Sequence, residues 1–396
     1  GHLHPRRGHR GLELGDERGR CRSEGRRLRV HGIEQLHRRQ RGEGDDAVEG
    51  DASGELAAAG VNASGVVVGG NTEPREAGDV VAAAHGERGM VASQHYLASE
   101  VGAAVLRDGG NAIDAAIATG FALGTVEPWM SGLGGCGFMT VYLARENRSY
   151  ALEFGVRAPI ALNVNDYPLS TGFDSDLFAW PGVVDNRNVL GPHSVAVPGY
   201  VAGLALAADR FATLSWGELL SPAISLVQQG LTVDWYSSLK IASSAQDIAG
   251  FESTRSVYLP DGQVPMGHWA GAPPVIELKG LAQTLQQLAD EGPETFYRGD
   301  LAGRLLRDAQ KVGISLTAED LAAYQAECIE LSGVAYRDAM VYAPAGLCGG
   351  PSMCDALAEL TRQVPVPGNQ PDGDFYCAVA DSLNSAYAHR LNRMGD

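Results

Sequence analysis

The spacing of apolar residues along the chain predicts a mixed α/β fold that begins near Gly89. Apolar residues recur at helical spacing from Phe375 to Met394, which indicates a long helix near the end of the sequence. Short runs rich in β-branched and aromatic residues indicate strands between the helices. No internal repeat is visible. We expect helices over residues 97–107, 112–125, 201–211, 278–290, 301–312 and 317–324, and strands over residues 90–93, 138–143, 150–154, 194–197 and 336–342.

Short-range signals mark the ends of several helices. Ser215 and Glu218 form an S-x-x-E capping box that opens a further helix, and Pro222 is expected to bend or restart it. Residues 108–111, Asp-Gly-Gly-Asn, end the helix before them in the way that glycine stops helices. Residues 159–192 are rich in Pro, Asp and Asn, so we expect irregular surface there.

A glycine-rich loop over residues 131–138, SGLGGCGF, raises the question of a dinucleotide site. From Gly132 it reads G-x-G-x-x-G. A dinucleotide fingerprint needs a strand before the loop and a helix after it, because the pyrophosphate sits on the N-terminus of that helix. Here a helix precedes the loop and two short strands follow it. The pattern therefore favours a tight turn over a phosphate-binding loop.

The start of the sequence differs in composition from the rest. The chain of 396 residues has a net charge of −17, but its first 42 residues carry 12 Arg against 5 acidic residues. They show no apolar periodicity and no aromatic residue to stack on a base, so a nucleic-acid-binding arm is disfavoured. Residues 43–80 are rich in Gly, Ala and acidic residues and indicate a flexible linker. We expect residues 1–80 to be a disordered or non-native head and linker, and residues 81–396 to hold the fold.

Composition also bears on location and redox state. No run approaches the roughly eighteen apolar residues of a membrane span, so we expect no membrane partner. The basic head lacks the apolar region of a secretory signal, which favours the cytoplasm over the periplasm. The six cysteines show no C-x-x-C pair and no zinc spacing, which favours reduced thiols over a disulfide framework.

Several common catalytic signatures are missing from the sequence. There is no G-x-S-x-G nucleophile elbow, no Gly-Lys-Ser/Thr of a P-loop, and no H-E-x-x-H or tight His/Asp cluster for a metal. The residues thus predict no catalytic nucleophile, no cofactor and no metal site in this chain. On the residues alone, an oxidoreductase (from the glycine pattern) and a non-enzymatic binding module remain as alternatives.

Taken in order, the segments resemble the γ-glutamyltranspeptidase (glutathione hydrolase) family. That family begins its fold with a strand, a helix, a GGNA-x-DAA helix and an SG-x-GGGGF loop, and the likeness here runs colinearly over about residues 89–396. The segments that carry it are residues 89–142 (GMVASQHYLASEVGAAVLRDGGNAIDAAIATGFALGTVEPWMSGLGGCGFMTVY), 194–204 (SVAVPGYVAGL), 216–230 (WGELLSPAISLVQQG), 296–305 (FYRGDLAGRL), 316–324 (LTAEDLAAY) and 386–396 (AYAHRLNRMGD).

The resemblance implies an α/β N-terminal-nucleophile fold, a four-layer α-β-β-α sandwich, with this chain as the large subunit and incomplete without the small one. Members are made as one precursor that cuts itself before a threonine, which becomes the nucleophile and, through its free α-amine, its own base. The γ-glutamyl group of glutathione or a related amide passes to this threonine and then to water or an acceptor amine. Since the sequence stops at Asp396 before any Thr-led segment, we expect the nucleophile on a small subunit outside this chain.

One departure from the family pattern bears on the substrate. Members usually have an Arg directly after the Phe of the second hairpin strand, where it holds the α-carboxylate of the γ-glutamyl group. Here Phe154 is followed by Gly155 and Val156, with Arg157 next. Residues two apart on a strand share a face, so Arg157 is the candidate substrate-binding residue; the alternative is an ordinary arginine at a hairpin end. Other functions that stay open are an acylase of the same fold acting on another amide, and an inactive fragment.

Overall fold

The computed structural model describes residues 66–69 (as backbone), 86–173, 180–267, 271–346, 348–363 and 371–393. The chain divides into two compact units, residues 1–54 and 55–396, and the described residues belong to the second. Most of the predicted head lies outside the described residues. One described strand at residues 66–69 falls inside the predicted range 1–80, and the boundary near residue 80 stays a prediction.

Helices make up most of the described part, and local signals explain several of them. Helices α3 and α5 begin with capping boxes, and α5 runs through Pro222 without the expected restart. The helices are α2 (Tyr96–Arg107), α3 (Ala112–Val126), α4 (Tyr200–Phe211), α5 (Trp216–Gln229), α6 (Trp235–Ser243), α7 (Ala245–Ala249), α8 (Glu252–Tyr258), α9 (Lys279–Glu291), α10 (Glu294–Tyr297), α11 (Asp300–Lys311), α12 (Ala318–Ala323), α13 (Gly349–Gln363) and α14 (Gly373–Arg393), with short 3₁₀ turns at Val164–Asp166, Val184–Asn186, Pro192–Ser194 and Pro260–Gly262.

The largest described sheet has three antiparallel strands in the order β3-β4-β9. Its central strand β4 pairs with β3 from Gly137↔Phe154 to Leu143↔Arg148, and with β9 from Tyr150↔Glu330 to Glu153↔Glu327. The other described sheets are two-stranded. The strands are β1 (Val66–Gly69), β2 (Gly89–Ala92), β3 (Gly137–Leu143), β4 (Arg148–Phe154), β5 (Leu169–Phe173), β6 (Pro181–Val183), β7 (Leu231–Thr232), β8 (Val275–Ile276), β9 (Glu327–Glu330), β10 (Val334–Tyr336) and β11 (Ala339–Val341).

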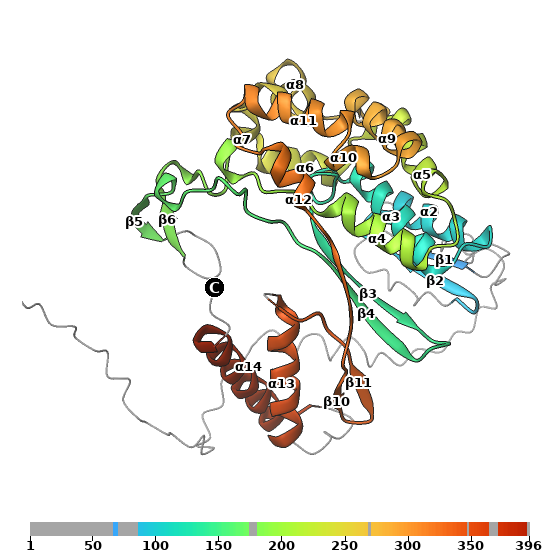
Figure 1. Cartoon of the computed structure of the whole chain (residues 1–396), viewed down its shortest axis with the longest axis vertical. Coiled ribbons are helices and arrows are strands. Elements are labelled where there is room, and N and C mark those ends of the chain that lie inside the picture. Colours follow the sequence, from blue (N-terminus) through green and yellow to red (C-terminus); the bar gives the residue numbers. More distant parts are fainter. Residues whose placement is uncertain are drawn as a thin grey trace, which may run out of the picture. The chain divides into compact units, whose positions relative to one another are not determined.

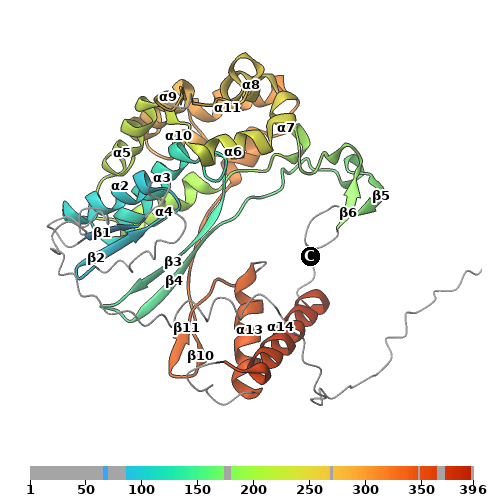
Figure 2. The ribbon, with the colours of Figure 1, turned by 180° about the vertical axis from the view of Figure 1, so that it is seen from behind.

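A layer of helices covers one face of the three-stranded sheet (Figures 1 and 2). Helix α4 contacts all three strands, and α3 packs on α2, α4 and α5. Phe154 of β4 is 3% exposed and lies edge-on to Tyr200 of α4, with ring centroids 6.3 Å apart. The helix approaches this closely because Gly203 has no side chain: a Cβ there would lie 2.1 Å from Cγ of Phe154. Burying such a phenylalanine stabilises the fold by about 1.5–3 kcal/mol.

A buried carboxylate joins the start of α3 to the connection between α4 and α5. Oδ1 of Asp114 accepts from the amides of Thr213 and Leu214 at 2.9 and 3.1 Å. Its Oδ2 accepts from the amide of Asn111 at 2.7 Å and from the hydroxyl of Thr213 at 2.6 Å. Burial would raise the pKa of Asp114, but these hydrogen bonds bring it below its ordinary value. The aspartate of the GGNA-x-DAA segment is therefore a structural cap.

Three regions differ from the sequence-based predictions. Residues 336–342, expected as one strand, instead contain the end of β10, a turn and β11, because Arg337 takes a positive φ of 57° and turns the chain. Residues 194–197 do not form the expected strand; Val197 makes only an isolated bridge with Arg157. The region expected to be irregular, 159–192, contains the hairpin β5–β6.

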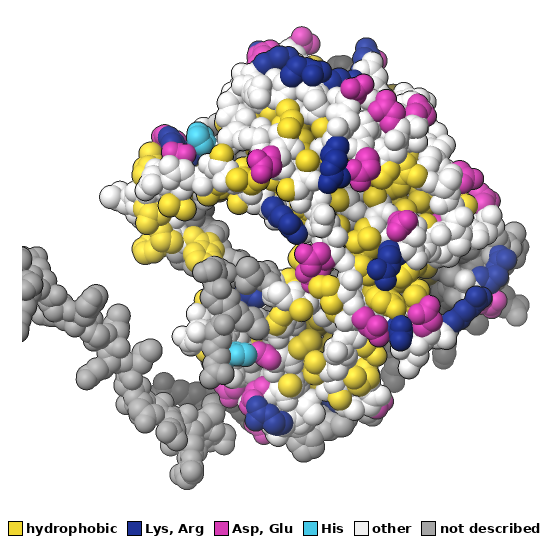
Figure 3. Space-filling view, viewed as in Figure 1, with side chains coloured by type: hydrophobic (Ala, Val, Ile, Leu, Met, Phe, Trp, Pro, Cys, Tyr) yellow, Lys and Arg dark blue, Asp and Glu magenta, His cyan; other side chains and the backbone are white. Residues whose placement is uncertain are grey.

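The exposed apolar side chains of the described part include groups on the three-stranded sheet and on the β5–β6 hairpin. The sheet face away from the helix layer presents Phe138 and Tyr142, which are 51% and 58% exposed. Hydrophobic side chains also gather over the β5–β6 hairpin (Figure 3), where Leu169 and Phe173 are 67% and 74% exposed. In the described ranges, no helix combines the length and apolarity needed to cross a membrane.

Candidate functional site

The glycine loop before β3 is a turn held by backbone hydrogen bonds. Gly135 donates its amide to the carbonyl of Gly132 at 3.0 Å, and a Cβ at Gly137 would lie 2.7 Å from the ring of Phe154. The carbonyl of Gly135 accepts from the amides of Gly199 and Tyr200, both at 3.0 Å. These amides lie at the N-terminus of α4 and pair with a protein carbonyl, while the loop itself leads into strand β3 and not into a helix whose N-terminus could receive a phosphate. This geometry supports the tight-turn interpretation.

Arg157 lies just beyond the end of β4. Its backbone exchanges two hydrogen bonds with Val197, at 3.2 and 2.8 Å. Its guanidinium donates to the carbonyl of Gln325 at 3.2 Å and lies 3.5 Å from Oε1 of Glu327. The side chain is 51% exposed, so this ion pair is weak and solvent-screened. The arginine is thus held near β9 but remains accessible to a ligand.

Tyr324 forms the floor beneath Arg157. The guanidinium carbon lies 5.3 Å from the centre of the Tyr324 ring, and the phenol donates to the carbonyl of Gly155 at 2.6 Å. The ring also stacks on Tyr297, with centroids 5.8 Å apart. Burial raises the pKa of Tyr324, although the charge of Arg157 acts in the opposite direction. Its neutral hydroxyl therefore fixes the Gly155 backbone beside the arginine.

These residues surround a cavity of about 280 Å³. A Cβ at Gly155 would meet no atom within 4 Å, so the position directly after Phe154 opens into free space. Oε1 of Glu153 is buried and has no hydrogen-bond partner among the described residues. The cavity wall holds no Ser, Thr or Cys; its lining is Phe138, Glu153, Gly155, Val156, Arg157, Tyr324, Gln325, Glu327 and Ala345.

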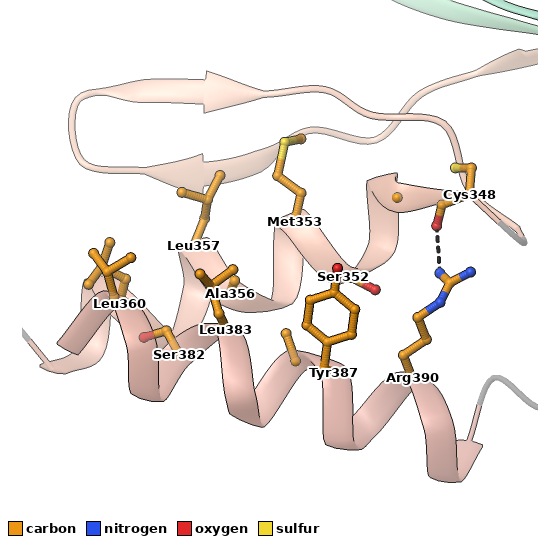
Figure 4. Close-up of a pocket in the computed structure, with 13 residues that line it drawn as sticks. Cys348, Ser352, Met353, Ala356, Leu357, Leu360, Ser382, Leu383, Tyr387 and Arg390 are labelled. Carbon is orange, nitrogen blue, oxygen red and sulfur yellow. Dashed lines mark hydrogen bonds between the residues drawn. The ribbon is translucent and has the colours of Figure 1, made fainter. Parts of the chain in front are cut away.

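A larger cavity of about 510 Å³ lies between α13 and α14 (Figure 4). Met353, Leu357 and Leu383 are among its apolar lining residues, which predominate. Its one cationic side chain, Arg390, donates to the carbonyl of Cys348 at 2.7 Å. This groove therefore lacks a set of converging charged groups, and we place the candidate site at the smaller cavity, where a cation, two carboxylates and a phenol converge.

Other buried acidic groups are structural or lie away from this cavity. Asp320 accepts from the amides of Ile160 and Thr317, and so caps α12. Glu127 is 3% exposed; its burial, followed by the charge of Asp234, raises its pKa. Within the described ranges, no three His, Cys, Asp or Glu side chains lie close enough together to hold a metal ion.

The sequence pointed to Arg157 and missed its neighbours. The structure places Arg157 among the lining residues of a cavity, together with Gly155, and its role in substrate binding stays a prediction. It also brings in Glu153, Tyr324 and Glu327, which no local motif marked. Tyr324 is the last residue of the LTAEDLAAY segment, which carried the family resemblance but did not mark Tyr324 as a site residue.

Comparisons with known proteins extend this picture. Residues 98–396 match the family model described as Gamma-glutamyltranspeptidase. The glutathione hydrolase proenzyme of Pseudomonas sp. (strain A14) is 32% identical over 316 residues, covering 78% of this chain and 52% of that protein. The Acylase ACY 1 proenzyme of Pseudomonas sp. (strain V22) is 36% identical over 264 residues, covering 66% of this chain and 45% of that protein.

Among solved structures, gamma-glutamyltranspeptidase of Helicobacter pylori superposes with a TM-score of 0.69 at 28% identity, over 78% of this chain and 85% of that one. The chain spans about half the length of the curated relatives that it matches.

Proposed function

This chain belongs to the gamma-glutamyltranspeptidase family, and from that premise we propose that it is the large-subunit part of an enzyme that transfers or hydrolyses the γ-glutamyl group of glutathione and related amides. The family match and the structural likeness confirm the predicted α/β N-terminal-nucleophile fold. In the proposal, the nucleophile is an N-terminal threonine of a small subunit, since the cavity lining contributed by this chain holds no Ser, Thr or Cys.

The cavity at Arg157 is the observation that carries the proposal. A substrate carboxylate needs a cation that faces open space, and Arg157 is half-exposed, lines the cavity, lies over the Tyr324 ring and contacts a carbonyl and a screened carboxylate. A bidentate Arg–carboxylate pair is stronger than either of these contacts. The side chain can therefore exchange its present partners for the α-carboxylate of a γ-glutamyl group.

An acylase of the same fold is the second candidate. Its support is specific: Gly155 stands where the family usually has arginine, and the 36% identical relative is an acylase proenzyme. The open space beside Gly155 would accommodate an acyl group of a different shape. In this version of the proposal Arg157 contributes little to turnover.

The small subunit is the proposed partner, and the sheet supplies its docking surface. Phe138 and Tyr142 of β3 and Ile329 of β9 are 51%, 58% and 38% exposed on strands of one sheet. Apolar surface of this kind on a sheet is stabilised when a second layer covers it.

The groove between α13 and α14 is a second surface that this chain leaves unfilled (Figure 4). The hydroxyl oxygens of Ser352 and Ser382, two of its lining residues, are buried and have no hydrogen-bond partner among the described residues.

The test is kinetic and uses the full-length precursor that contains both subunits. Arg157→Ala should lower kcat/KM for glutathione by at least about tenfold, because a hydrogen bond to a charged group contributes about 1.5–3 kcal/mol. Autocleavage should survive, since it does not involve the substrate carboxylate. Arg148→Ala is the matched control, because Arg148 lies at the other end of β4, is also half-exposed and also pairs with a glutamate at 3.5 Å.

Two outcomes would count against the proposal. If Arg157→Ala and Arg148→Ala have equal effects on glutathione turnover, then Arg157 is a hairpin-end arginine and the acylase hypothesis gains. If the purified 396-residue chain alone turns over γ-glutamyl-p-nitroanilide, then the nucleophile lies within this chain and the assignment of catalysis to a small subunit is wrong.

A further inference from the structure

The groove between α13 and α14 is polar at one end and apolar at the other. The start of α13 lies against the end of α14, where Arg390 donates to the carbonyl of Cys348 at 2.7 Å (Figure 4). Leu360 lies at the opposite end of the groove (Figure 4). The volume of about 510 Å³ is in the range of small-molecule sites. The groove therefore suits an elongated molecule with a polar head and an apolar body.

The polar end of the groove favours a single negative charge. Among the described residues that line it, Arg390 is the one cation and none is acidic. A guanidinium has several N–H donors, so Arg390 can bind a ligand while it keeps its contact with the neutral carbonyl of Cys348. The positive end of the α13 dipole lies at the same place, since this helix begins at Gly349. Asp355 of α13 does not line the groove and is hydrogen-bonded to His389 at 2.6 Å.

Two serine hydroxyls in the groove lack the partners that buried polar atoms normally have. Ser382 is 1% exposed, and the hydroxyl oxygens of Ser382 and Ser352 are buried without a hydrogen-bond partner among the described residues. An unpaired buried hydroxyl costs free energy, so these two oxygens point to a ligand. Ser382 and Arg390 are separated by about 12 Å along the axis of α14. A ligand that pairs with both residues has two polar groups joined by an apolar chain of that length.

We propose that the groove between α13 and α14 binds a hydroxyalkanoate, an alkyl carboxylate whose chain ends in a hydroxyl group. Arg390 and Ser352 bind the carboxylate, leucine side chains of both helices pack on the alkyl chain, and Ser382 pairs with the far hydroxyl. A carboxylate fits better than a doubly charged phosphate monoester, because one cationic side chain faces the head group. The groove shares no lining residue with the cavity at Arg157, so the inference goes beyond the proposed function and does not rest on it.

The experiment is isothermal titration of the purified 396-residue chain with four ligands. The polar ends of 10-hydroxydecanoate are about as far apart as Ser382 and Arg390, so we expect it to bind most tightly, at one site per chain. Decanoate lacks the far hydroxyl and should bind more weakly. Six-carbon 6-hydroxyhexanoate should bind at least about tenfold more weakly, because it buries fewer methylene groups and cannot reach both residues. The amine 10-amino-1-decanol has the same length and the opposite charge, and should not compete.

Substitutions assign the two polar contacts. Arg390→Gln should weaken the binding of 10-hydroxydecanoate at least about tenfold, because it removes a charge-assisted hydrogen bond. Ser382→Ala should remove the advantage of 10-hydroxydecanoate over decanoate and leave decanoate binding unchanged. Arg362→Gln is the matched control, since Arg362 lies on α13, pairs with Glu359 and does not line the groove. Far-UV circular dichroism checks that the variants fold.

The proposal is overturned if neither carboxylate binds, if 10-amino-1-decanol binds as tightly, or if Ser382→Ala keeps the preference for the hydroxylated acid. It is also overturned if Arg390→Gln binds no more weakly than Arg362→Gln. A repeat with the full-length precursor separates the small molecule from a protein occupant. Binding to the precursor supports the proposal, whereas binding to the 396-residue chain alone would mean that the small subunit fills the groove, and would overturn it.

Discussion

Replacing Asp114 by asparagine tests how firmly the helix layer behind the site is fastened. The carboxylate accepts four hydrogen bonds, two at each oxygen, from the start of α3 and from the connection between α4 and α5. If the new amide nitrogen replaces Oδ2, the hydroxyl of Thr213 can rotate and accept from it. The amide of Asn111 then faces a donor and loses its partner.

The cost follows from this geometry. One buried amide without an acceptor costs about 1–3 kcal/mol, and the remaining bonds lose their charge assistance, so we expect a loss of about 2–4 kcal/mol in the free energy of unfolding. With a urea m-value of about 2–3 kcal/mol per molar, the midpoint of unfolding should fall by about 1–2 M. Asp209→Asn is the control, because Asp209 lies on the exposed side of α4.

Acid provides a second readout for Asp114. In the folded protein the pKa of Asp114 lies below the ordinary value of an aspartate. The ionised carboxylate therefore stabilises the fold at pH values above that ordinary pKa, and this contribution is lost as the pH falls through the lower, folded-state pKa. The difference between parent and Asp114→Asn should therefore shrink in strong acid. If Asp114→Asn shifts the urea midpoint no further than Asp209→Asn, the carboxylate does not hold α3 in place and the reasoning is refuted.

Two further predictions concern α2 and α4. His95 caps α2 by accepting from the amide of Leu97 at 3.2 Å, and burial, opposed by the charge of Asp234, lowers its pKa. The stability that the neutral His95 contributes is present above the ordinary pKa of 6.5 and is lost as the pH falls through the lower folded-state pKa. Asparagine caps a helix without titrating, so His95→Asn should reduce the fall of Tm toward acid pH in a series of Tm measurements against pH. If the fall of Tm is the same in His95→Asn, His95 is not its source. Gly203→Ala should destabilise the fold by about 1–3 kcal/mol or more in urea unfolding, because its Cβ meets Phe154. Gly217→Ala, whose Cβ would be 3.8 Å from its nearest neighbour, should be neutral or stabilising; equal effects of the two substitutions would contradict the close-packing argument.

The parts of the fold that the sequence predicted well are those with local signals. The Ser215–Glu218 box and the cap at Thr317 both appear at the starts of their helices, because a capping box needs only four consecutive residues. The helix–loop–hairpin order around the glycine loop is confirmed for the same reason. Helix α13 was missed: it begins with Gly349, Gly350 and Pro351, a sequence typical of a loop.

The candidate site depends on contacts that no local pattern contains. Arg157 could be chosen because one family motif ends near it, but Glu153 and Glu327 become neighbours only through the pairing of β4 with β9. Nothing in the sequence around Glu327 marks that pairing. The hairpin turn at Arg337 was missed likewise, since a positive φ at a residue other than Gly or Asn has no sequence signature.

The two walls of the cavity come from segments that are far apart in the sequence, and this affects when the site forms during folding. The contacts of Arg157 with Gln325 and of Tyr324 with Gly155 join residues 168 and 169 positions apart. Closing so long a loop costs chain entropy before favourable contacts between its ends can form, so we expect β9 to pair with β4 late in folding. Helices α2, α3 and α4 and the β3–β4 hairpin leave the ribosome long before β9 does. A nascent chain therefore carries β4 with one edge unpaired while the segment between β4 and β9 is made, and the pocket is assembled only when β9 pairs with β4.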